Sequence, residues 1–358
     1  MKYIDEFSDP FFAAKLAEEI NMKMARIGRP VRLMEVCGTH TMNIGRAGLR
    51  KMLSEQLHLL SGPGCPVCVT PSEFITESIM IAEEEDVIIT TFGDMVRVPN
   101  TAGRRLSEFP TEKVRIVYTP LEALEIAGDE PSKRVVFLGV GFETTAPTVA
   151  QTIMNASNSG SGNFFCLSAH KIIPPALTVL AGNPDSMIDG FILPGHVSVI
   201  IGLKGYEKID MRGVVTGFEP IDILKGIVML LDQIIKGEQY ILNAYERVVT
   251  YKGNNKMKAV MDEVFVLRDS NWRGFSTIGS SGYLISEKYS DYDASREFSF
   301  VIDDEEEPAA CRCAEVLQGI CSPAECPLFA GICSPEDPVG PCMVSSEGAC
   351  SAYYKYER

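Results

Sequence analysis

The stretch VVFLGVGFETT, residues 135–145, joins an apolar run to a polar turn that begins at Gly141. Apolar runs rich in β-branched and aromatic residues are typical of strands that helices cover on both faces, as in a parallel sheet. Seven similar runs occupy residues 31–36, 58–61, 87–91, 114–118, 164–168, 190–193 and 214–216. Helical patterns such as residues 72–85 and 121–127 lie between them, so the sequence predicts an α/β fold with parallel sheets.

The eight expected strands form two sets of four in chain order, and the turns that follow them resemble each other. FGD at residues 92–94 resembles PGH at residues 194–196, about one hundred residues later. Generic strand-to-helix turns would also give this likeness. We infer two similar α/β domains, residues 31–130 and 131–245, that flank a cleft.

The two ends of the chain are expected to form separate parts. Residues 1–30 are expected to form a helical segment that packs on the rest. A helix near residues 221–235, which Gly237 would end, leads out of the second α/β domain. Residues 246–358 are expected to form a C-terminal domain that contains most of the cysteines.

The composition argues against several classes of function. Apolar residues make up 46% of the chain and charged residues 23%, as in ordinary soluble globular proteins. The net charge of -15 argues against nucleic acid or an anionic membrane as a partner, since both need a basic surface. No apolar run approaches the roughly 20 residues that a transmembrane helix requires. The N-terminus MKYIDE lacks the basic and apolar regions of a signal peptide, so we expect a cytoplasmic protein.

The eleven cysteines indicate metal binding or redox chemistry rather than structural disulfides. Thiols in the cytoplasm are kept reduced, so clustered cysteines there more often bind metal or exchange electrons. Seven of the eleven lie in the last 48 residues: Cys311, Cys313, Cys321, Cys326, Cys333, Cys342 and Cys350. This uneven distribution marks the C-terminal segment as a unit of its own.

Further cysteines follow two of the expected strands, where ligands bind in open parallel sheets. Cys65 and Cys68 form a C-P-x-C element between a strand and a helix, a position in which the helix dipole lowers a thiol pKa. Cys37 lies beside Thr39 and His40 at another strand end. A buried, inert pair and a buried free cysteine are the alternatives. Three thiols with a nearby imidazole would suit iron, zinc or copper(I).

The second half of the chain places polar residues at equivalent turns. His170 and His196 each follow an expected strand, although a lone histidine is more often structural than a ligand. Glu143 and Lys171 could position or protonate a ligand, or could pair with each other. The glycines near Gly141 lack the third glycine of a dinucleotide fingerprint, so nucleotide binding is unsupported.

The C-terminal cysteines favour an iron–sulfur cluster over zinc. Prolines and glycines separate them, giving loops that can wrap a cluster, and four thiolates are the usual ligands of a [4Fe-4S] centre. Two repeated C-x-x-C knuckles, the commonest signature of structural zinc, are absent from the sequence. Seven thiols exceed the four that one cluster needs, which leaves some for a disulfide or for packing.

Several motifs resemble those of one family, the hydrogenase maturation factors HypD. The matching segments are MEVCGTHT (34–41), GPGCPVC (62–68), GFETTAP (141–147), SAHK (168–171), LPGHVS (193–198), GFEP (217–220) and CPLFAGICSPEDPVGPCMVSSEGACSAYYKY (326–356). They occur in order along nearly the whole chain. The resemblance implies two α/β domains and a third domain that holds a [4Fe-4S] cluster.

The resemblance also implies a function and roles for individual residues. HypD proteins are scaffolds on which iron receives two cyanides and one carbon monoxide, giving the Fe(CN)2CO group of [NiFe] hydrogenases. They work with HypC and accept cyanide from HypE. Cys37 would hold the iron together with a cysteine of HypC, and Cys65 and Cys68 would form a redox pair. His196 and Glu347 match family motifs and would assist ligand handling, and His40 joins them as a candidate catalytic residue.

For the cluster, the family pattern implies four ligands and one neighbouring disulfide. The implied ligands are Cys311, Cys326, Cys333 and Cys350, and the implied disulfide joins Cys313 to Cys342. Cys321 lies outside the motif and could compete as a ligand, whereas Cys166, in an expected strand, is expected in the core. Ala330 departs from the family, which often has glycine after the phenylalanine.

Electrons from the cluster could reach the cleft through thiol–disulfide steps, much as in ferredoxin:thioredoxin reductase. Two alternatives remain open at the level of sequence. One is a free-standing iron–sulfur protein that reduces disulfides of partner proteins, and the other is an interaction protein whose C-terminal cysteines bind zinc. The sequence also leaves open whether the chain is an enzyme in the strict sense.

Overall fold

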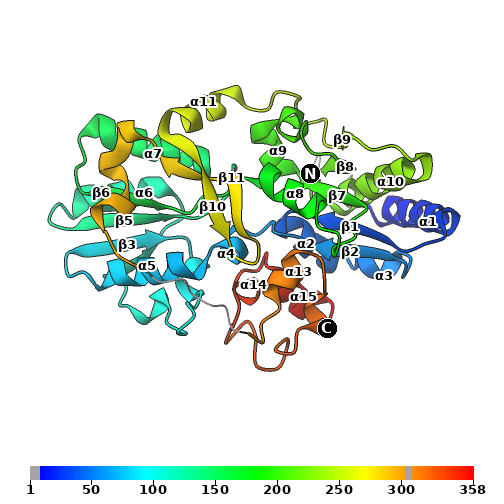
Figure 1. Cartoon of the computed structure of the whole chain (residues 1–358), viewed down its shortest axis with the longest axis horizontal. Helices are drawn as coiled ribbons and strands as arrows, with labels where there is room; N and C mark the ends of the chain where they lie inside the picture. Colours follow the sequence, from blue (N-terminus) through cyan, green and yellow to red (C-terminus); the bar gives the residue numbers. More distant parts are fainter. Residues whose placement is uncertain (1–8, 303–308) are drawn as a thin grey trace.

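The computed structural model describes residues 9–302 and 309–358 and contains two parallel sheets and one hairpin. Sheet A has the order β2 (Leu57–Ser61), β1 (Val31–Glu35), β7 (Gly190–Pro194), β8 (Gly213–Thr216), β9 (Ile241–Asn243). Sheet B has the order β4 (Val114–Ile116), β3 (Val87–Thr91), β5 (Arg134–Gly139), β6 (Phe164–Ser168). Figure 1 shows the sheets side by side along the long axis. The predicted fold class, two parallel-sheet α/β parts with a cysteine-rich C-terminal region, is confirmed.

The assignment of the eight strands to two consecutive sets of four is wrong. Strand β1 pairs with β7, through Leu33 and Gly190 among others, so sheet A takes strands from both predicted domains, 31–130 and 131–245. Numbered within each sheet by chain order, the first four strands of sheet A and those of sheet B share the order 2-1-3-4. Sheet B is therefore a similar unit inserted between β2 and β7. Apolar patterns identify strands, but partner choice depends on long-range packing that these patterns do not encode.

Helices cover both faces of the sheets, and their bounds place the turns discussed below. They are α1 (Pro10–Ile27), α2 (Gly38–Arg46), α3 (Leu49–Met52), α4 (Pro66–Val69), α5 (Ser72–Glu83), α6 (Pro120–Asp129), α7 (Ala146–Ser159), α8 (Ile173–Ala181), α9 (Gly195–Ile201), α10 (Pro220–Lys236), α11 (Asn255–Val264), α12 (Ala294–Glu297), α13 (Cys313–Leu317), α14 (Pro341–Val344) and α15 (Ala349–Tyr356). The helices expected near 72–85, 121–127 and 221–235 are confirmed as α5, α6 and α10. Within the described ranges, none of the helices combines the length and apolar character needed to cross a membrane.

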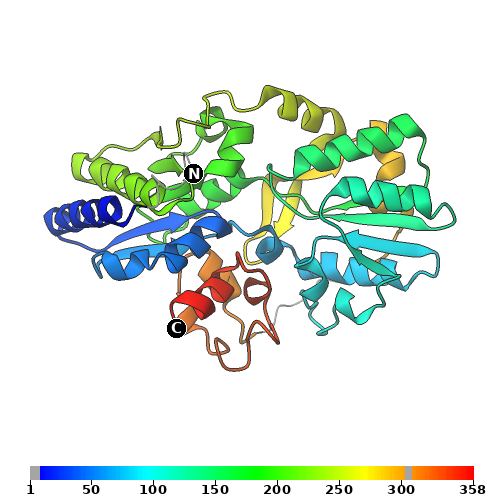
Figure 2. The same cartoon turned by 180° about the vertical axis from the view of Figure 1, so that it is seen from behind.

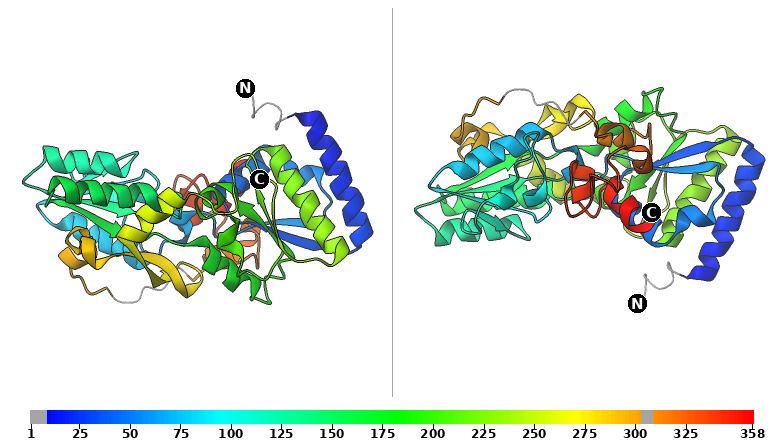
Figure 3. Two further views of the ribbon diagram at one scale, coloured as in Figure 1. Left: turned by 90° about the horizontal axis from the view of Figure 1, so that it is seen from above. Right: turned by 90° about the horizontal axis from the view of Figure 1, so that it is seen from below.

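The N-terminal helix α1 lies along α10, as the views from above and below show (Figure 3), and both helices share a core with one face of sheet A. Ile20 and Met24 of α1 are fully buried in a core shared with Leu230 of α10. Gly237 ends α10 with its backbone in the left-handed region (φ 69°), and its N–H donates to the carbonyl groups of Gln233 and Ile234 in the last turn. The Cys166 side chain, in β6 of sheet B, is fully buried, so its expected place in the core is confirmed.

A hairpin of β10 (Phe265–Trp272) and β11 (Ser276–Ile285) joins the two sheet units near the middle of the molecule (Figure 2). The backbone N–H of Arg273 donates to the carbonyl of Val69 (2.9 Å), and the N–H of Ile172 donates to the carbonyl of Ser281 (2.9 Å). These bonds tie the hairpin to α4 of one unit and to the turn after β6 of the other. Residues 246–302 thus pack on the sheets, and we call residues 309–358 the cysteine-rich segment.

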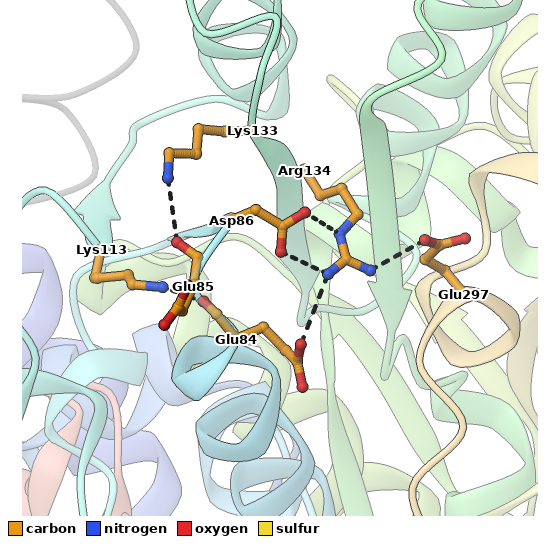
Figure 4. A network of polar contacts seen from close by, with 7 residues as sticks. All are labelled: Glu84, Glu85, Asp86, Lys113, Lys133, Arg134 and Glu297. Atoms are coloured by element: carbon orange, nitrogen blue, oxygen red, sulfur yellow. Dashed lines mark hydrogen bonds and ion pairs between the residues drawn. The ribbon is translucent and has the colours of Figure 1, made fainter.

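A network of ion pairs lies at the amino ends of the strands of sheet B (Figure 4). Arg134, the first residue of β5, binds both oxygens of Asp86 at 2.7 and 2.9 Å and reaches Glu297 of α12 at 3.1 Å. Partly exposed pairs of this kind contribute at most about 1 kcal/mol each. Their effect is to fasten α12 to the start of β5, at the end of the strand opposite to the turn at Gly141.

Candidate functional site

The candidate site lies where the order of sheet A reverses. Strand β1 connects to β2 on one side, whereas β7 connects to β8 on the other, so the carboxyl ends of β1 and β7 form the switch point at which open parallel sheets bind ligands. Cys37 follows β1, and His196 follows β7. Together with Thr39 and Glu347, these residues make up what we call the Cys37 site.

Glycines let three segments distant in the chain meet at Cys37. The N–H of Gly38 donates to the carbonyl of Gly64 (3.2 Å), and a Cβ on Gly64 would lie 2.2 Å from the backbone nitrogen of Cys37. A Cβ on Gly38 would lie 2.4 Å from the Cβ of Glu347 in the cysteine-rich segment. Such contacts are possible only without a side chain. The turn of Cys37, the loop of Cys65 and the segment of Glu347 therefore pack directly together.

The Cys37 thiol is half-buried at the N-terminus of α2. Burial raises its pKa to about 12, and the nearby carboxylate of Glu347 adds to the increase, while the backbone N–H groups of Thr39 and His40 oppose it. The Thr39 hydroxyl donates to Oε1 of Glu347 at 2.7 Å, which fixes that carboxylate beside the thiol. At neutral pH the free thiol is protonated, so a metal that binds it must displace the proton.

His40 supports the site rather than turning its Nε2 toward the thiols. This atom lies 2.9 Å from the carbonyl oxygen of Gly217 and 2.9 Å from the hydroxyl of Thr216, at the end of β8. The imidazole stacks on the ring of Phe218, with centroids 4.7 Å apart. His196 contacts the same ring at 4.1 Å, but its side chain is exposed. His40 thus anchors α2 to β8, and His196 lies at the solvent side.

Burial lowers the pKa of His40 to about 4, which makes stability depend on pH. In the unfolded chain the imidazole has a pKa near 6.5, so between about pH 6.5 and pH 4 it is protonated in the unfolded state but neutral in the folded state. Proton binding then favours the unfolded state, and the unfolding free energy decreases as the pH falls through this range. We expect wild type to lose about 2 kcal/mol more unfolding free energy than His40→Gln between pH 8 and pH 5. Urea unfolding at both pH values measures the difference, with exposed His58→Gln as control. Equal losses of unfolding free energy in wild type and His40→Gln would contradict the lowered pKa of His40.

A chain of contacting thiols runs from the loop of Cys65 into the cysteine-rich segment. Cys65 precedes α4 and Cys68 lies within it, and their thiols are hydrogen bonded to each other. Cys68 also contacts Cys342, Cys342 contacts Cys313, and Cys313 contacts Cys350. Cys313 and Cys342 are both in the thiol form, so the implied pair consists of contacting thiols rather than a disulfide. Five sulfur atoms thus connect sheet A with the C-terminus.

The expectation that the helix lowers the thiol pKa in the C-P-x-C element is wrong for Cys68. Its side chain is fully buried, and the loss of hydration raises its pKa well above the usual value. Helix α4 has only four residues, which leaves a small dipole to oppose that cost. Cys68 is therefore a neutral thiol in the reduced protein.

The cysteine-rich segment brings most of its thiols together. A Cβ on Gly340 would lie 2.7 Å from the sulfur of Cys313 and 2.8 Å from that of Cys311. The sulfur of Cys333 accepts the N–H of Val339 at 3.3 Å. Cys326 lies 4.0 Å from the carbonyl oxygen of Ala310, the residue before Cys311.

Two other residues of this segment stand out. The sulfur of Cys321 lies 3.8 Å from Glu315, and its side chain packs in a separate small cluster. Ala330 adopts φ 56°, a left-handed conformation that glycine adopts more readily than alanine. Among residues 9–302 and 309–358, no group of three or more His, Cys, Asp or Glu side chains stands in metal-binding geometry.

Glu35 and Glu143 are buried carboxyl groups near strand ends. The sequence predicted no role for Glu35, and it left open whether Glu143 positions a ligand or pairs with Lys171. Glu35 of β1 accepts the Thr41 hydroxyl at 2.7 Å, and burial raises its pKa to about 8. Glu143 accepts the N–H of Ile173 at 3.0 Å, with a pKa raised by burial to about 7. It does not pair with Lys171. A charged residue at the end of an otherwise apolar run is the sequence signal that could have identified Glu35.

Comparison with known proteins places this chain in one family. Residues 12–357 match the HypD family, described as "Hydrogenase formation hypA family". The chain is 41% identical to the hydrogenase maturation factor HypD of Escherichia coli K12, covering 100% of this chain and 99% of that protein. It is 42% identical to HypD of Rhodobacter capsulatus, covering 99% and 98%. The resemblance inferred from the motifs is therefore confirmed: this chain belongs to the HypD family.

Proposed function

We propose that this protein acts in the maturation of [NiFe] hydrogenases, as the scaffold on which iron acquires two cyanides and one carbon monoxide. The names of its relatives, hydrogenase maturation factors, support the general role. The observation that carries the specific proposal is the chain of thiols that begins at Cys350 and ends in the loop packed against Cys37. A scaffold for low-spin iron needs a soft anchor and a source of electrons beside it.

In this proposal Cys37 holds the iron together with a cysteine of HypC, and cyanide arrives from HypE. The thiol is half-buried at a switch point, which leaves one side for the partner and restricts competing ligands. Iron displaces the thiol proton, and the N–H groups of Thr39 and His40 then stabilise the thiolate. His196, exposed beside the turn, and Glu347, held by Thr39, are positioned to handle protons of incoming groups.

We further propose that Cys311, Cys326, Cys333 and Cys350 hold a [4Fe-4S] cluster, which when bound supplies one-electron transfer. The chemistry of the donor set supports such a cluster, because the four groups are thiols that are half-buried or buried, and Cys333 already accepts a backbone N–H. Cys313 and Cys342 lie between this group and Cys68. Once reduced to a dithiol by two one-electron steps and two protons, they would reduce a Cys65–Cys68 disulfide by thiol–disulfide exchange and become a disulfide themselves. The Cys65–Cys68 pair would be the last donor before the iron.

Replacing Cys65 with Ala tests this electron route. The variant leaves Cys68 without its partner, so no disulfide can form in the loop, and we expect a loss of hydrogenase maturation of at least about tenfold. The measurement is hydrogenase activity in a complemented deletion strain, with the infrared bands of iron-bound cyanide and carbon monoxide on the purified protein. Cys321→Ser, outside the thiol chain, is the matched control. Full maturation and a normal infrared signature in Cys65→Ala would refute the route.

A protein-disulfide reductase that resembles ferredoxin:thioredoxin reductase is the second candidate, because the same thiol chain could serve it. That protein would reduce thioredoxin-like partners without HypC, whereas the scaffold should copurify with HypC. Metal analysis after anaerobic purification separates both from a zinc-binding interaction protein. We expect four irons with matching sulfide per chain, and a single zinc would contradict both iron–sulfur proposals.

A further inference from the structure

A hollow of about 320 Å³ opens at the carboxyl end of β6, away from the Cys37 site. Its walls come from the first two turns of α5, the turn after β6 and strand β10, and the charged lining residues include Glu73, Glu77, Lys171 and Arg268. None of these residues belongs to the Cys37 site or to the thiol chain. The volume lies at the lower end of the range for small-molecule sites.

Lys171 is a buried amine on this wall whose hydrogen bonds go to neutral groups. Only 3% of the residue is exposed, and its Nζ donates to the hydroxyl of Ser270 and to the carbonyl of Asn271, both at 2.6 Å. An ammonium group has three donors, so one remains for a further acceptor. In the described part of the chain, no carboxylate lies within ion-pair distance of Lys171. A buried charge without a counter-ion is costly, so an anionic group bound in the hollow would stabilise the protonated form of Lys171.

Apart from Asp269, the elements around the hollow separate its charges by sign. Strand β10 and the turn after β6 supply Arg268 and Lys171, which are close enough for Arg268 to lower the Lys171 pKa further. Helix α5 supplies Glu73 and Glu77 from successive turns. Asp269 of β10 is engaged by the N–H of Ser280 at 2.8 Å. A pure anion would meet the two glutamates, and a pure cation would meet Lys171 and Arg268.

We propose that this hollow binds a small zwitterion of the amino-acid class, its carboxylate on Lys171 and Arg268 and its ammonium group toward Glu73 and Glu77. The carboxylate supplies the missing counter-charge of Lys171, and the guanidinium of Arg268 adds donors that match a carboxylate. The hollow is too small for a nucleic acid or a folded partner.

Binding should depend on pH in a way that identifies both ends of the ligand. Burial, with repulsion from Arg268, lowers the pKa of Lys171 to about 7, while Glu73 opposes the change. Binding therefore weakens above about pH 7, as Lys171 loses its proton. Burial raises the pKa of Glu77 to about 6, with Arg268 opposing, so the ammonium contact weakens below about pH 6. The zwitterion should bind best between these values, whereas acetate should show no loss on the acidic side.

Saturation-transfer NMR on the full chain tests the proposal, with a pool of common L-amino acids as the probe and acetate and methylammonium as single-charge probes. We expect at least one amino acid to bind about tenfold more tightly than either single-charge probe at pH 6.5. Arg268→Gln and Glu77→Gln, one exposed and one partly buried, should each weaken that binding about tenfold. Exposed Arg296→Gln, which pairs with Glu287 elsewhere, is the matched control.

Three results would overturn the proposal: no saturable binding by any amino acid, equal binding by wild type and Arg268→Gln, or acetate binding as tightly as the best amino acid. The last result would leave a plain anion site. The assay reads ligand binding and does not depend on hydrogenase maturation, so its outcome is independent of the proposed function.

Discussion

Replacing Cys37 with Ser is expected to abolish maturation while leaving the fold intact. Serine has nearly the shape of cysteine, but its hydroxyl is a hard, weakly acidic ligand that does not replace a thiolate on low-spin iron. Cys37 is half-buried at the start of α2, with no side-chain bond in the cap that serine would break. We expect at least a hundredfold loss of hydrogenase activity in a complemented strain, because even residues that only support a metal ligand contribute up to about that factor.

The infrared spectrum of the purified variant should lack the bands of iron-bound cyanide and carbon monoxide. Cys166→Ser is a useful comparison, because this cysteine is buried in β6 of sheet B and lies outside the thiol chain. It should reduce stability but keep the infrared bands. A Cys37→Ser protein with normal bands would remove Cys37 as the iron anchor, and the proposed scaffold with it.

Replacing Gly64 with Ala is expected to have the largest effect on stability. The new Cβ would lie 2.2 Å from the nitrogen and 2.4 Å from the Cα of Cys37, and 2.3 Å from the carbonyl carbon of Val36. These are backbone atoms of the segment that joins β1 to α2, so no side-chain rotation relieves the overlap. We expect a loss of about 3 kcal/mol in unfolding free energy. The same overlap would move Cys37 away from the loop that contains Cys65. We therefore expect lower hydrogenase activity even at temperatures at which the variant is folded.

Gly128→Ala is the matched control for that experiment. Gly128 lies in α6, where a Cβ would meet no atom within 4 Å, so alanine should stabilise the helix by about 0.5–1 kcal/mol. Thermal unfolding of both variants measures the contrast, and hydrogenase activity at low temperature measures the functional part. A Gly64→Ala protein that melts like wild type would show that the loop and the Cys37 turn do not pack as described.

Features that depend on contacts between residues close in the sequence could be predicted, whereas features that depend on contacts between distant segments could not. Most of the eight strands were predicted because a strand buried on both faces needs apolar side chains at nearly every position, as in Val135 and Val136. The ends of α6 and α10 were close for the same local reason, since Pro120 and Gly237 begin and end helices through their own backbone preferences. The pairing of β1 with β7 was not predictable, because the two strands are separated in the sequence by the whole of sheet B and meet only when that inserted unit has folded aside.

The candidate site shows the same division. The sequence placed Cys37 and Cys65 at strand ends, and the parallel sheet brings such ends to one edge, so their proximity could be expected. The direction of His40, turned to Gly217 rather than to a thiol, depends on a contact with a strand far along the chain. The raised pKa of Cys68 depends on burial under the cysteine-rich segment, which outweighs the short helix beside it.

By itself, then, the sequence determined the α/β class, eight of the eleven strands in the described residues and most of the turns in which the reactive residues lie. These features depend on side-chain pattern and local backbone preference. Only the tertiary structure decided that sheet B is inserted into sheet A, that Cys68 meets Cys342, and that Glu347 lies beside Cys37. The physical reason is that these contacts join segments far apart in the chain, through close packing at Gly38, Gly64 and Gly340 that no local pattern specifies.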